Sequence, residues 1–211
     1  MEIKRRTQNE RSAATRAALI AAARPLFAGH GFAAVGTEAI VRAAGVTRGA
    51  LYHQFADKTE LFAAVVDQVE AGVVERLLAS LPAEETVDAL TTLDRGVDAW
   101  LDACAEPEVQ RIVLMDAPAV LGWERWRTLG LRHGLGLIEG ALQAAMASGD
   151  VAEQPVRPLA HLLVSAFDEA ALYVARASDP DAARTEMRSA LRNLLAGLAR
   201  SPGPGIGHPP Q

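Results

Sequence analysis

Apolar side chains recur at helical spacing along most of this 211-residue chain. Ile20, Ala23 and Phe27 stand at positions i, i+3 and i+7 of a first helix at about 10–29. No segment between turn signals shows the two-residue alternation that is typical of a strand. The sequence therefore predicts an all-α fold of about nine helices.

Glycines and prolines mark where the predicted helices end. Pro25 removes one backbone hydrogen bond, so we expect it to kink or cut the first helix, which Gly29 and Gly31 then end. Asp57 and Glu60 form a capping box that begins a long helix running to about residue 80. Because residues 201–211 contain four prolines, we expect them to form a disordered tail. Further helices are expected near 37–44, 48–54, 84–104, 107–116, 121–147, 157–177 and 181–199.

The cysteine count and the two ends of the chain limit its class. Cys104 is the single cysteine, so the chain forms no intramolecular disulfide and no cysteine zinc site. We expect no metal, no cofactor and a location in the reducing cytoplasm. Residues 1–12 lack the apolar core of a secretion signal, and no stretch of about 20 apolar residues predicts a membrane span.

The net charge of −5, from 21 basic and 26 acidic side chains, argues on its own against a nucleic acid partner. Its distribution argues the other way. Residues 1–62 hold nine basic and five acidic side chains, whereas the rest of the chain is strongly acidic. Such an asymmetry is typical of a chain with a nucleic-acid-binding end. On charge alone, a solvated basic face is the alternative.

Residues 37–55, TEAIVRAAGVTRGALYHQF, predict two short helices joined by a tight turn. Gly45 can adopt the left-handed backbone that ends the first helix, and the Thr47 hydroxyl can cap the second. This is the pattern of a helix-turn-helix, whose second helix enters the major groove of DNA. The structural alternative is an ordinary helical hairpin with Tyr52 and Phe55 as core aromatics. The candidate DNA contacts are Thr37, Thr47, Arg48, Gly49, Tyr52, His53 and Lys58.

The run AGVTRGALYHQFADKTEL, within a match over residues 10–62, resembles the DNA-binding domain of the tetracycline-repressor (TetR) family of bacterial regulators. The resemblance implies a DNA-binding domain at 1–62 and a ligand-binding and dimerisation domain at 63–200. It also implies a homodimeric repressor that a small molecule releases from a palindromic double-stranded DNA operator. Pro25 and Val41 depart from the family's usual residues, and neither is a candidate DNA contact.

The rest of the chain offers candidates for a ligand pocket and a dimer interface. Large side chains suit a hydrophobic ligand, although a tryptophan at helical spacing is more often part of a core. The candidate ligand contacts are Trp100, Met115, Trp123, Trp126, His133, Phe167 and Tyr173. The last two helices carry wide apolar faces, which either close the monomer core or pair with a second copy as a four-helix bundle. The resemblance favours the dimer, with Leu159, Leu163, Phe167, Met187, Leu191 and Leu195 at the interface.

Catalysis is not expected, because the chain has no phosphate-binding glycine loop, nucleophile elbow or zinc-binding HExxH. Asp168, Glu169 and His161 form the nearest acid–base cluster, but adjacent helical side chains point about 100° apart. A DNA-binding regulator controlled by a protein partner, without a small-molecule inducer, is the alternative to ligand sensing.

Overall fold

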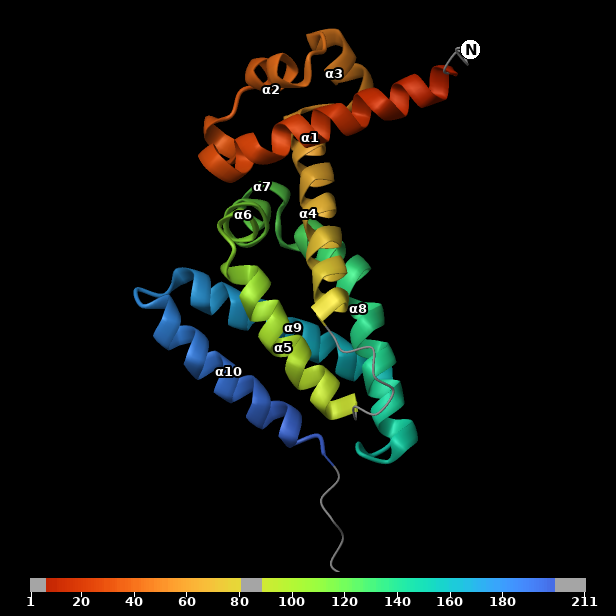
Figure 1. Cartoon of the computed structure of the whole chain (residues 1–211), viewed down its shortest axis with the longest axis vertical. Helices are drawn as coiled ribbons and strands as arrows, with labels where there is room; N and C mark the ends of the chain where they lie inside the picture. Colours follow the sequence, from red (N-terminus) through yellow and green to blue (C-terminus); the bar gives the residue numbers. More distant parts are fainter. Residues whose placement is uncertain (1–6, 81–88, 200–211) are drawn as a thin grey trace, which may run out of the picture.

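The computed structural model describes residues 7–80 and 89–199, and apart from one isolated bridge between Val151 and Ala199 its regular structure is helical (Figure 1). The predicted all-α fold is confirmed. Because α6, η1 and α7 follow one another without a gap, the described residues form nine helical segments. The elements are α1 (Gln8–Ala34), α2 (Thr37–Ala44), α3 (Arg48–Gln54), α4 (Lys58–Ser80), α5 (Ala89–Ala105), α6 (Pro107–Val109), the π-helix η1 (Gln110–Asp116), α7 (Ala117–Leu121), α8 (Trp123–Ser148), α9 (Val156–Arg176) and α10 (Pro180–Ala196).

The helix boundaries agree with the prediction in most places. The helices expected at 37–44 and 48–54 have the predicted bounds. The helix expected at 121–147 begins instead at Trp123, because Gly122 has a φ of 78° and separates it from α7. The predicted start at residue 84 and the predicted tail at 201–211 lie outside the described residues.

Helix α1 begins at a capping box that the sequence prediction missed. The Thr7 amide donates to Glu10 Oε2 at 2.7 Å, and the Glu10 amide donates to Thr7 Oγ1 at 3.3 Å. By length and composition, α1 is the one helix among the described residues that could cross a membrane. Leu19 and Phe27 are fully buried in a core that α1 shares with α4, so α1 acts here as a core helix.

The predicted interruption of α1 at Pro25 is wrong. Helical dihedrals continue past Pro25 and are interrupted at Gly31, where φ is 77°. The lost hydrogen bond is tolerated because Ala23 and Phe27, on either side, are fully buried and hold the helix in place. A Cβ on Gly31 would lie 3.3 Å from Asp116 Oδ2, so both the backbone and the packing favour glycine there.

Helix α4 begins with half of the predicted capping box. The Glu60 amide donates to Asp57 Oδ1 at 2.8 Å. The Glu60 carboxylate does not return to the backbone, because it accepts two hydrogen bonds from Arg125 of α8 at 2.7 and 2.8 Å. A residue expected to serve a local cap therefore joins α4 to α8.

Helix α4 runs from the end that holds α1, α2 and α3 into a larger helical body (Figure 1). One hydrophobic cluster joins α1–α4 to η1, α7 and parts of α5, α8 and α9, and a second joins α5, α8, α9 and α10. At the junction of α1 and α4, the Phe62 ring centroid lies 5.1 Å from that of Phe27 and 5.0 Å from that of Phe32. These aromatic contacts attach the small end to the body.

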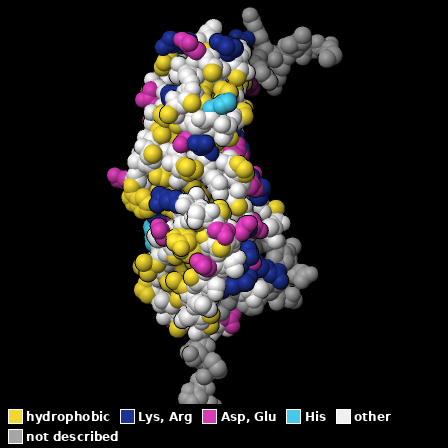
Figure 2. All heavy atoms as spheres, turned by 90° about the vertical axis from the view of Figure 1, so that its left-hand side faces the viewer, with side chains coloured by type: hydrophobic (Ala, Val, Ile, Leu, Met, Phe, Trp, Pro, Cys, Tyr) yellow, Lys and Arg dark blue, Asp and Glu magenta, His cyan; other side chains and the backbone are white. Residues whose placement is uncertain are grey.

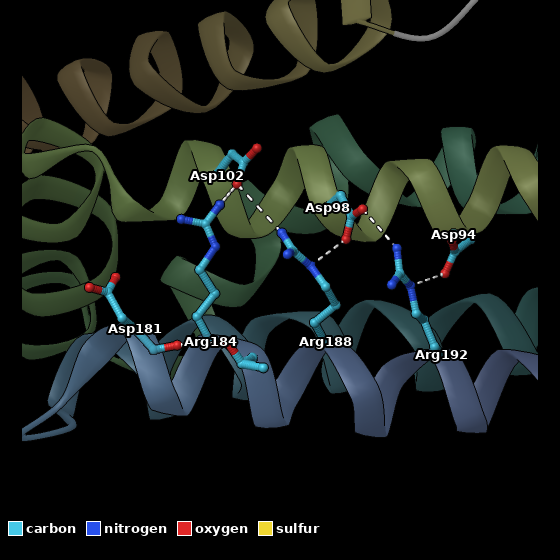
Figure 3. Close-up of polar contacts among 8 residues, drawn as sticks. Asp94, Asp98, Asp102, Asp181, Arg184, Arg188 and Arg192 are labelled. Carbon is cyan, nitrogen blue, oxygen red and sulfur yellow. Dashed lines mark hydrogen bonds and ion pairs between the residues drawn. The ribbon is translucent and has the colours of Figure 1, made fainter.

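Helix α10 lies antiparallel to α5, and a ladder of ion pairs joins the two helices (Figure 3). Three arginines one helical turn apart face three aspartates with the same spacing, so turning α10 about its axis would break all the pairs together. Exposed pairs each stabilise a protein by about 1 kcal/mol or less, so the ladder mainly sets orientation. The pairs are Arg184–Asp102, Arg188–Asp98 at 2.6 Å, Arg192–Asp94 at 2.8 Å and Arg192–Asp98 at 2.9 Å.

Replacing Gly136 with alanine should raise the free energy of unfolding by up to about 1 kcal/mol. Gly136 is exposed on α8, and an added Cβ would meet nothing within 4 Å. Urea denaturation at an unchanged m value measures the gain. Gly149→Ala is the control and should be destabilising, because Gly149 has a φ of 84°. A Gly136→Ala protein less stable than the parent would contradict the regular α8 described here.

Candidate DNA interface and ligand cavity

Helices α2 and α3 form the predicted helix-turn-helix. Gly45 ends α2 with a left-handed φ of 65°, and Thr47 Oγ1 accepts the Ala50 amide at 3.2 Å at the start of α3. Ile40 and Leu51 are fully buried beneath the two helices. The turn thus leaves the N-terminus and one face of α3 in solvent, as major-groove binding requires.

Five of the candidate DNA contacts share this exposed surface: Thr47, Arg48, Gly49, Tyr52 and His53. The Arg48 guanidinium lies 5.6 Å from the Tyr52 ring centroid and 3.7 Å from Glu38 Oε1. Hydrogen bonding to Arg48, and after it to Thr37, lowers the pKa of the Tyr52 phenol. The contacts of Arg48 with Glu38 and Tyr52 thus lie at exposed positions on the surface of the helix-turn-helix.

Two further details concern the start of α2 and the aromatic residues of the hairpin. Gly36 is the N-cap of α2 and makes no side-chain cap, so Thr37 is the first residue of the helix. Phe55 is buried as the hairpin alternative required, but Tyr52 is 44% exposed. Phe55 therefore packs in the core as in an ordinary helical hairpin, while Tyr52 on the second helix stays in solvent.

The structure places Lys58 apart from the other candidate contacts. Its Nζ atom donates to the carbonyls of Phe32 at 2.9 Å and Val35 at 3.0 Å, so it holds the segment between α1 and α2. Arg16 of α1, which the sequence analysis did not single out, donates to the Gln54 carbonyl at 3.3 Å at the end of α3. These two cations hold the backbone on either side of the helix-turn-helix through hydrogen bonds to its carbonyls.

The α6–η1 segment is hydrogen-bonded to α1 at two points. Glu108 of α6 accepts two hydrogen bonds from Arg24, both at 2.7 Å, and the bond from Arg24 lowers the pKa of the Glu108 carboxyl. Asp116, the last residue of η1, accepts the Phe32 amide at 2.7 Å. These contacts join the segment that contains α6 and η1 directly to α1.

A cavity of about 100 Å³ lies within the body, with walls from α4, α5, α6, η1, α8 and α9. The structure places four of the candidate ligand contacts in its wall, which are Trp100, Trp126, His133 and Phe167. The other three lie outside the wall because their side chains point to solvent: Met115 is 54%, Trp123 64% and Tyr173 47% exposed. Within residues 7–80 and 89–199, no group of three His, Cys, Asp or Glu residues could hold a metal ion.

Two acidic residues in the cavity wall, Glu70 and Asp168, were not predicted as ligand contacts. Burial, reinforced by Asp168 and Asp67, raises the pKa of Glu70 to about 8. Burial also raises the pKa of Asp168 to about 6, although Arg127, 2.5 Å away, opposes the shift. Glu70 could have been found from the sequence, because it interrupts the apolar stripe of α4 one turn before Val73.

Most of the predicted dimer contacts are buried inside a single chain. Leu163, Phe167, Leu191 and Leu195 are between 1% and 8% exposed and belong to the core of α5, α8, α9 and α10. Leu159 and Met187 are partly buried against the same core. The apolar faces thus close the monomer core, the alternative left open by the sequence, and the four buried side chains are covered by their own chain.

Two family models match this chain. One, described as "Bacterial regulatory proteins, tetR family", matches residues 19–65, and the other, "Tetracyclin repressor-like, C-terminal domain", matches residues 90–198. The chain belongs to the TetR family of transcriptional regulators. TetR-family regulators bind DNA operators and act as homodimers, and they are not enzymes.

Known proteins agree with the assignment to the TetR family. The solved structure of a TetR-family regulator from Pectobacterium atrosepticum is 37% identical, with a TM-score of 0.81 over 93% of this chain and 100% of that one. The HTH-type transcriptional regulator CymR of Pseudomonas putida is 34% identical over 57% of this chain, and the match spans 61% of CymR. The structure of RolR in complex with resorcinol has the same fold, with a TM-score of 0.72, 19% identity and coverage of 94% of this chain and 100% of that one.

Replacing Glu70 with glutamine should stabilise this TetR-family protein more at pH 8 than at pH 5. The pKa of folded Glu70, about 8, lies above its unfolded value of 4.5, so unfolding releases a proton between these pH values and stability falls as pH rises. Glutamine is neutral throughout and escapes this loss. Thermal melts should show a gain in Tm that is larger at pH 8 by at least about 3 °C. Glu75→Gln, at an exposed position on the same helix, is the control; an equal Glu70→Gln gain at both pH values would contradict the argument.

Proposed function

We propose that this protein is a cytoplasmic, homodimeric repressor whose paired α3 helices bind a palindromic operator until a small molecule with an apolar body enters the cavity. One observation carries the proposal: the α6–η1 segment lines the cavity on one side and is hydrogen-bonded to α1 on the other. A ligand in the cavity can therefore act on the helix that supports α2 and α3. The cavity also favours a small-molecule signal over control by a protein partner alone.

The exposed face of α3 supplies the DNA-reading groups. Lys and Arg side chains lie at the end of the molecule that holds α2 and α3, with acidic side chains among them, and a further group of basic side chains lies on the helical body (Figure 2). The Arg48 fork suits a guanine edge or a phosphate, and Gly49 lets the backbone approach the bases. Tyr52, His53 and Thr37 suit phosphate oxygens. Lys58 contributes by holding the position of the helix-turn-helix.

Transmission runs through the short α6–η1 segment. Val109, Val113 and Leu114 face the cavity, while Glu108 and Asp116 of the same segment hold α1. Seven residues of this segment are π-helical. The π-helix is rare in proteins overall, and where it occurs it is often at a functional site. A ligand that fits one position of η1 better than another shifts the equilibrium between operator-binding and released states.

The dimer uses surfaces other than the buried leucines. One α3 helix makes too few base contacts for a specific operator, so a second copy is needed. On α9, Leu162 and Tyr173 are 68% and 47% exposed and lie about three turns apart on one face, and Leu194 of α10 is 46% exposed. Hydrophobic side chains also gather over the helical body in Figure 2. We place the dimer contact on these outward faces of α9 and α10.

Arg48→Ala should weaken operator binding at least about tenfold without unfolding the domain, because a bidentate base contact contributes about 1–3 kcal/mol. Fluorescence anisotropy with the protein's own upstream DNA measures the affinity, which should fall steeply with salt. Arg95→Ala, at an exposed position of α5, is the matched control and should bind like the parent. Unchanged affinity in Arg48→Ala would remove Arg48 from the interface.

Leu162→Glu should convert the dimer into a monomer at micromolar concentration, because it places a charge in an apolar contact. Sedimentation velocity measures the oligomeric state, and the monomer should bind the palindromic operator more weakly. Leu78→Glu, at a 48% exposed leucine of α4, is the control and should remain a dimer. A Leu162→Glu protein that stays dimeric would place the interface elsewhere.

A further inference from the structure

Glu70 brings an unpaired carboxyl group to the cavity wall. Its side chain extends from the middle of α4, and the residue is only 9% exposed. Across residues 7–80 and 89–199, its oxygens form no hydrogen bond or ion pair. A carboxyl group that ionises in a mostly apolar wall without a partner is destabilising, so its presence in a binding cavity calls for an explanation.

The other charged groups around Glu70 have partners. On α9, Asp168 pairs with Arg127 of α8 at 2.5 Å. On α4, Asp67 pairs with Arg132 at 2.8 Å and contacts His133 Nε2 at 2.9 Å, both on α8. The walls from α6 and η1 are apolar, and α5 adds the thiol of Cys104 nearby, whose pKa is raised by burial. Glu70 is the acidic group left without a cation in this set.

The surroundings of Glu70 leave room for a small apolar body. Trp100, Trp126 and Phe167 line the cavity, and aromatic faces attract organic cations as well as apolar groups. Gly130 on α8 faces the carboxyl, and a Cβ there would lie 3.6 Å from Glu70 Oε2. Gly134, one turn further on, also lines the cavity and has open space where a Cβ would stand.

We propose that the cavity binds a small organic amine, whose ammonium group pairs with the Glu70 carboxylate while its apolar body packs against Trp100, Trp126 and Phe167. The inference rests on the proposed ligand-responsive function and specifies the chemical class of the ligand. An ammonium supplies the missing cation, and the aromatic wall excludes water from the pair. A neutral hydroxylated ring of the same size has no positive charge with which to stabilise the ionised form of Glu70.

Binding of an ammonium group releases one proton to solvent. Free Glu70 is largely protonated at neutral pH because its pKa is about 8, and it must ionise to form the pair. The affinity should therefore rise by up to about tenfold per pH unit between pH 6.5 and 7.5, while the amine keeps its own proton. Asp168, whose pKa is about 6, is already mostly ionised at pH 6.5, so its ionised fraction rises by a much smaller factor than that of Glu70 over this window.

Isothermal titration calorimetry of the full chain with benzylamine and benzyl alcohol tests the proposal, since the two probes share a ring and differ in charge. Benzylamine should bind at least tenfold more tightly than the alcohol, more tightly at pH 7.5 than at 6.5, and with release of a proton, which two buffers of different ionisation enthalpy reveal. Glu70→Gln should weaken benzylamine at least tenfold, whereas Glu75→Gln should bind like the parent. Thermal melts verify that both variants fold.

Three results would overturn the proposal: equal affinity for benzyl alcohol, unchanged benzylamine affinity in Glu70→Gln, or no binding of benzylamine, cyclohexylamine and butylamine at millimolar concentration. Operator release by the same probes separates this inference from the proposed function. An amine that binds through Glu70 without releasing the operator supports the ligand class and contradicts the ligand-responsive repressor. Release by a neutral compound that is unchanged in Glu70→Gln supports the repressor and contradicts the amine site.

Discussion

The packing of α1 onto α4 is the contact on which the rest of this molecule depends. Phe27 and Phe62 are fully buried, with ring centroids 5.1 Å apart, and each removes a large apolar surface from water. Lys58 at the start of α4 adds hydrogen bonds to the Phe32 and Val35 carbonyls, which hold the end of α1 against α4. Helices α2 and α3 have little core of their own, so their orientation follows from this one joint.

Helix α4 also reaches the cavity, so one helix contacts both the proposed ligand site and the DNA-binding end. Its first turns hold α1, while Glu70 and Val73 further along line the cavity. The α6–η1 segment makes a second connection through Glu108 and Asp116. Two elements therefore touch both the cavity and α1, and these short, packed connections support the proposed transmission from the cavity to the DNA-binding end.

Most charged side chains that join helices lie near the surface. Bidentate pairs such as Arg24–Glu108 and Arg125–Glu60 are partly exposed, so water still solvates them and the cost of desolvating their charges is small. The α5–α10 ladder orients the last helix in the same way. Glu70 is the exception, a carboxyl kept in an apolar wall. The basic end and the acidic body explain how a chain with a net charge of −5 can present a surface that suits DNA.

The amino-acid sequence by itself determined the helices and the helix-turn-helix, because these depend on local chemistry. Gly45 and Thr47 cap neighbouring helices within a few residues of chain, and apolar periodicity identifies each helix. Only the tertiary structure decided what each apolar face packs against. Leu191 faces α5 and α9 instead of a second chain, and Glu70 meets Asp168 across about a hundred residues of sequence. Such contacts depend on how distant helices pack, which no local pattern encodes.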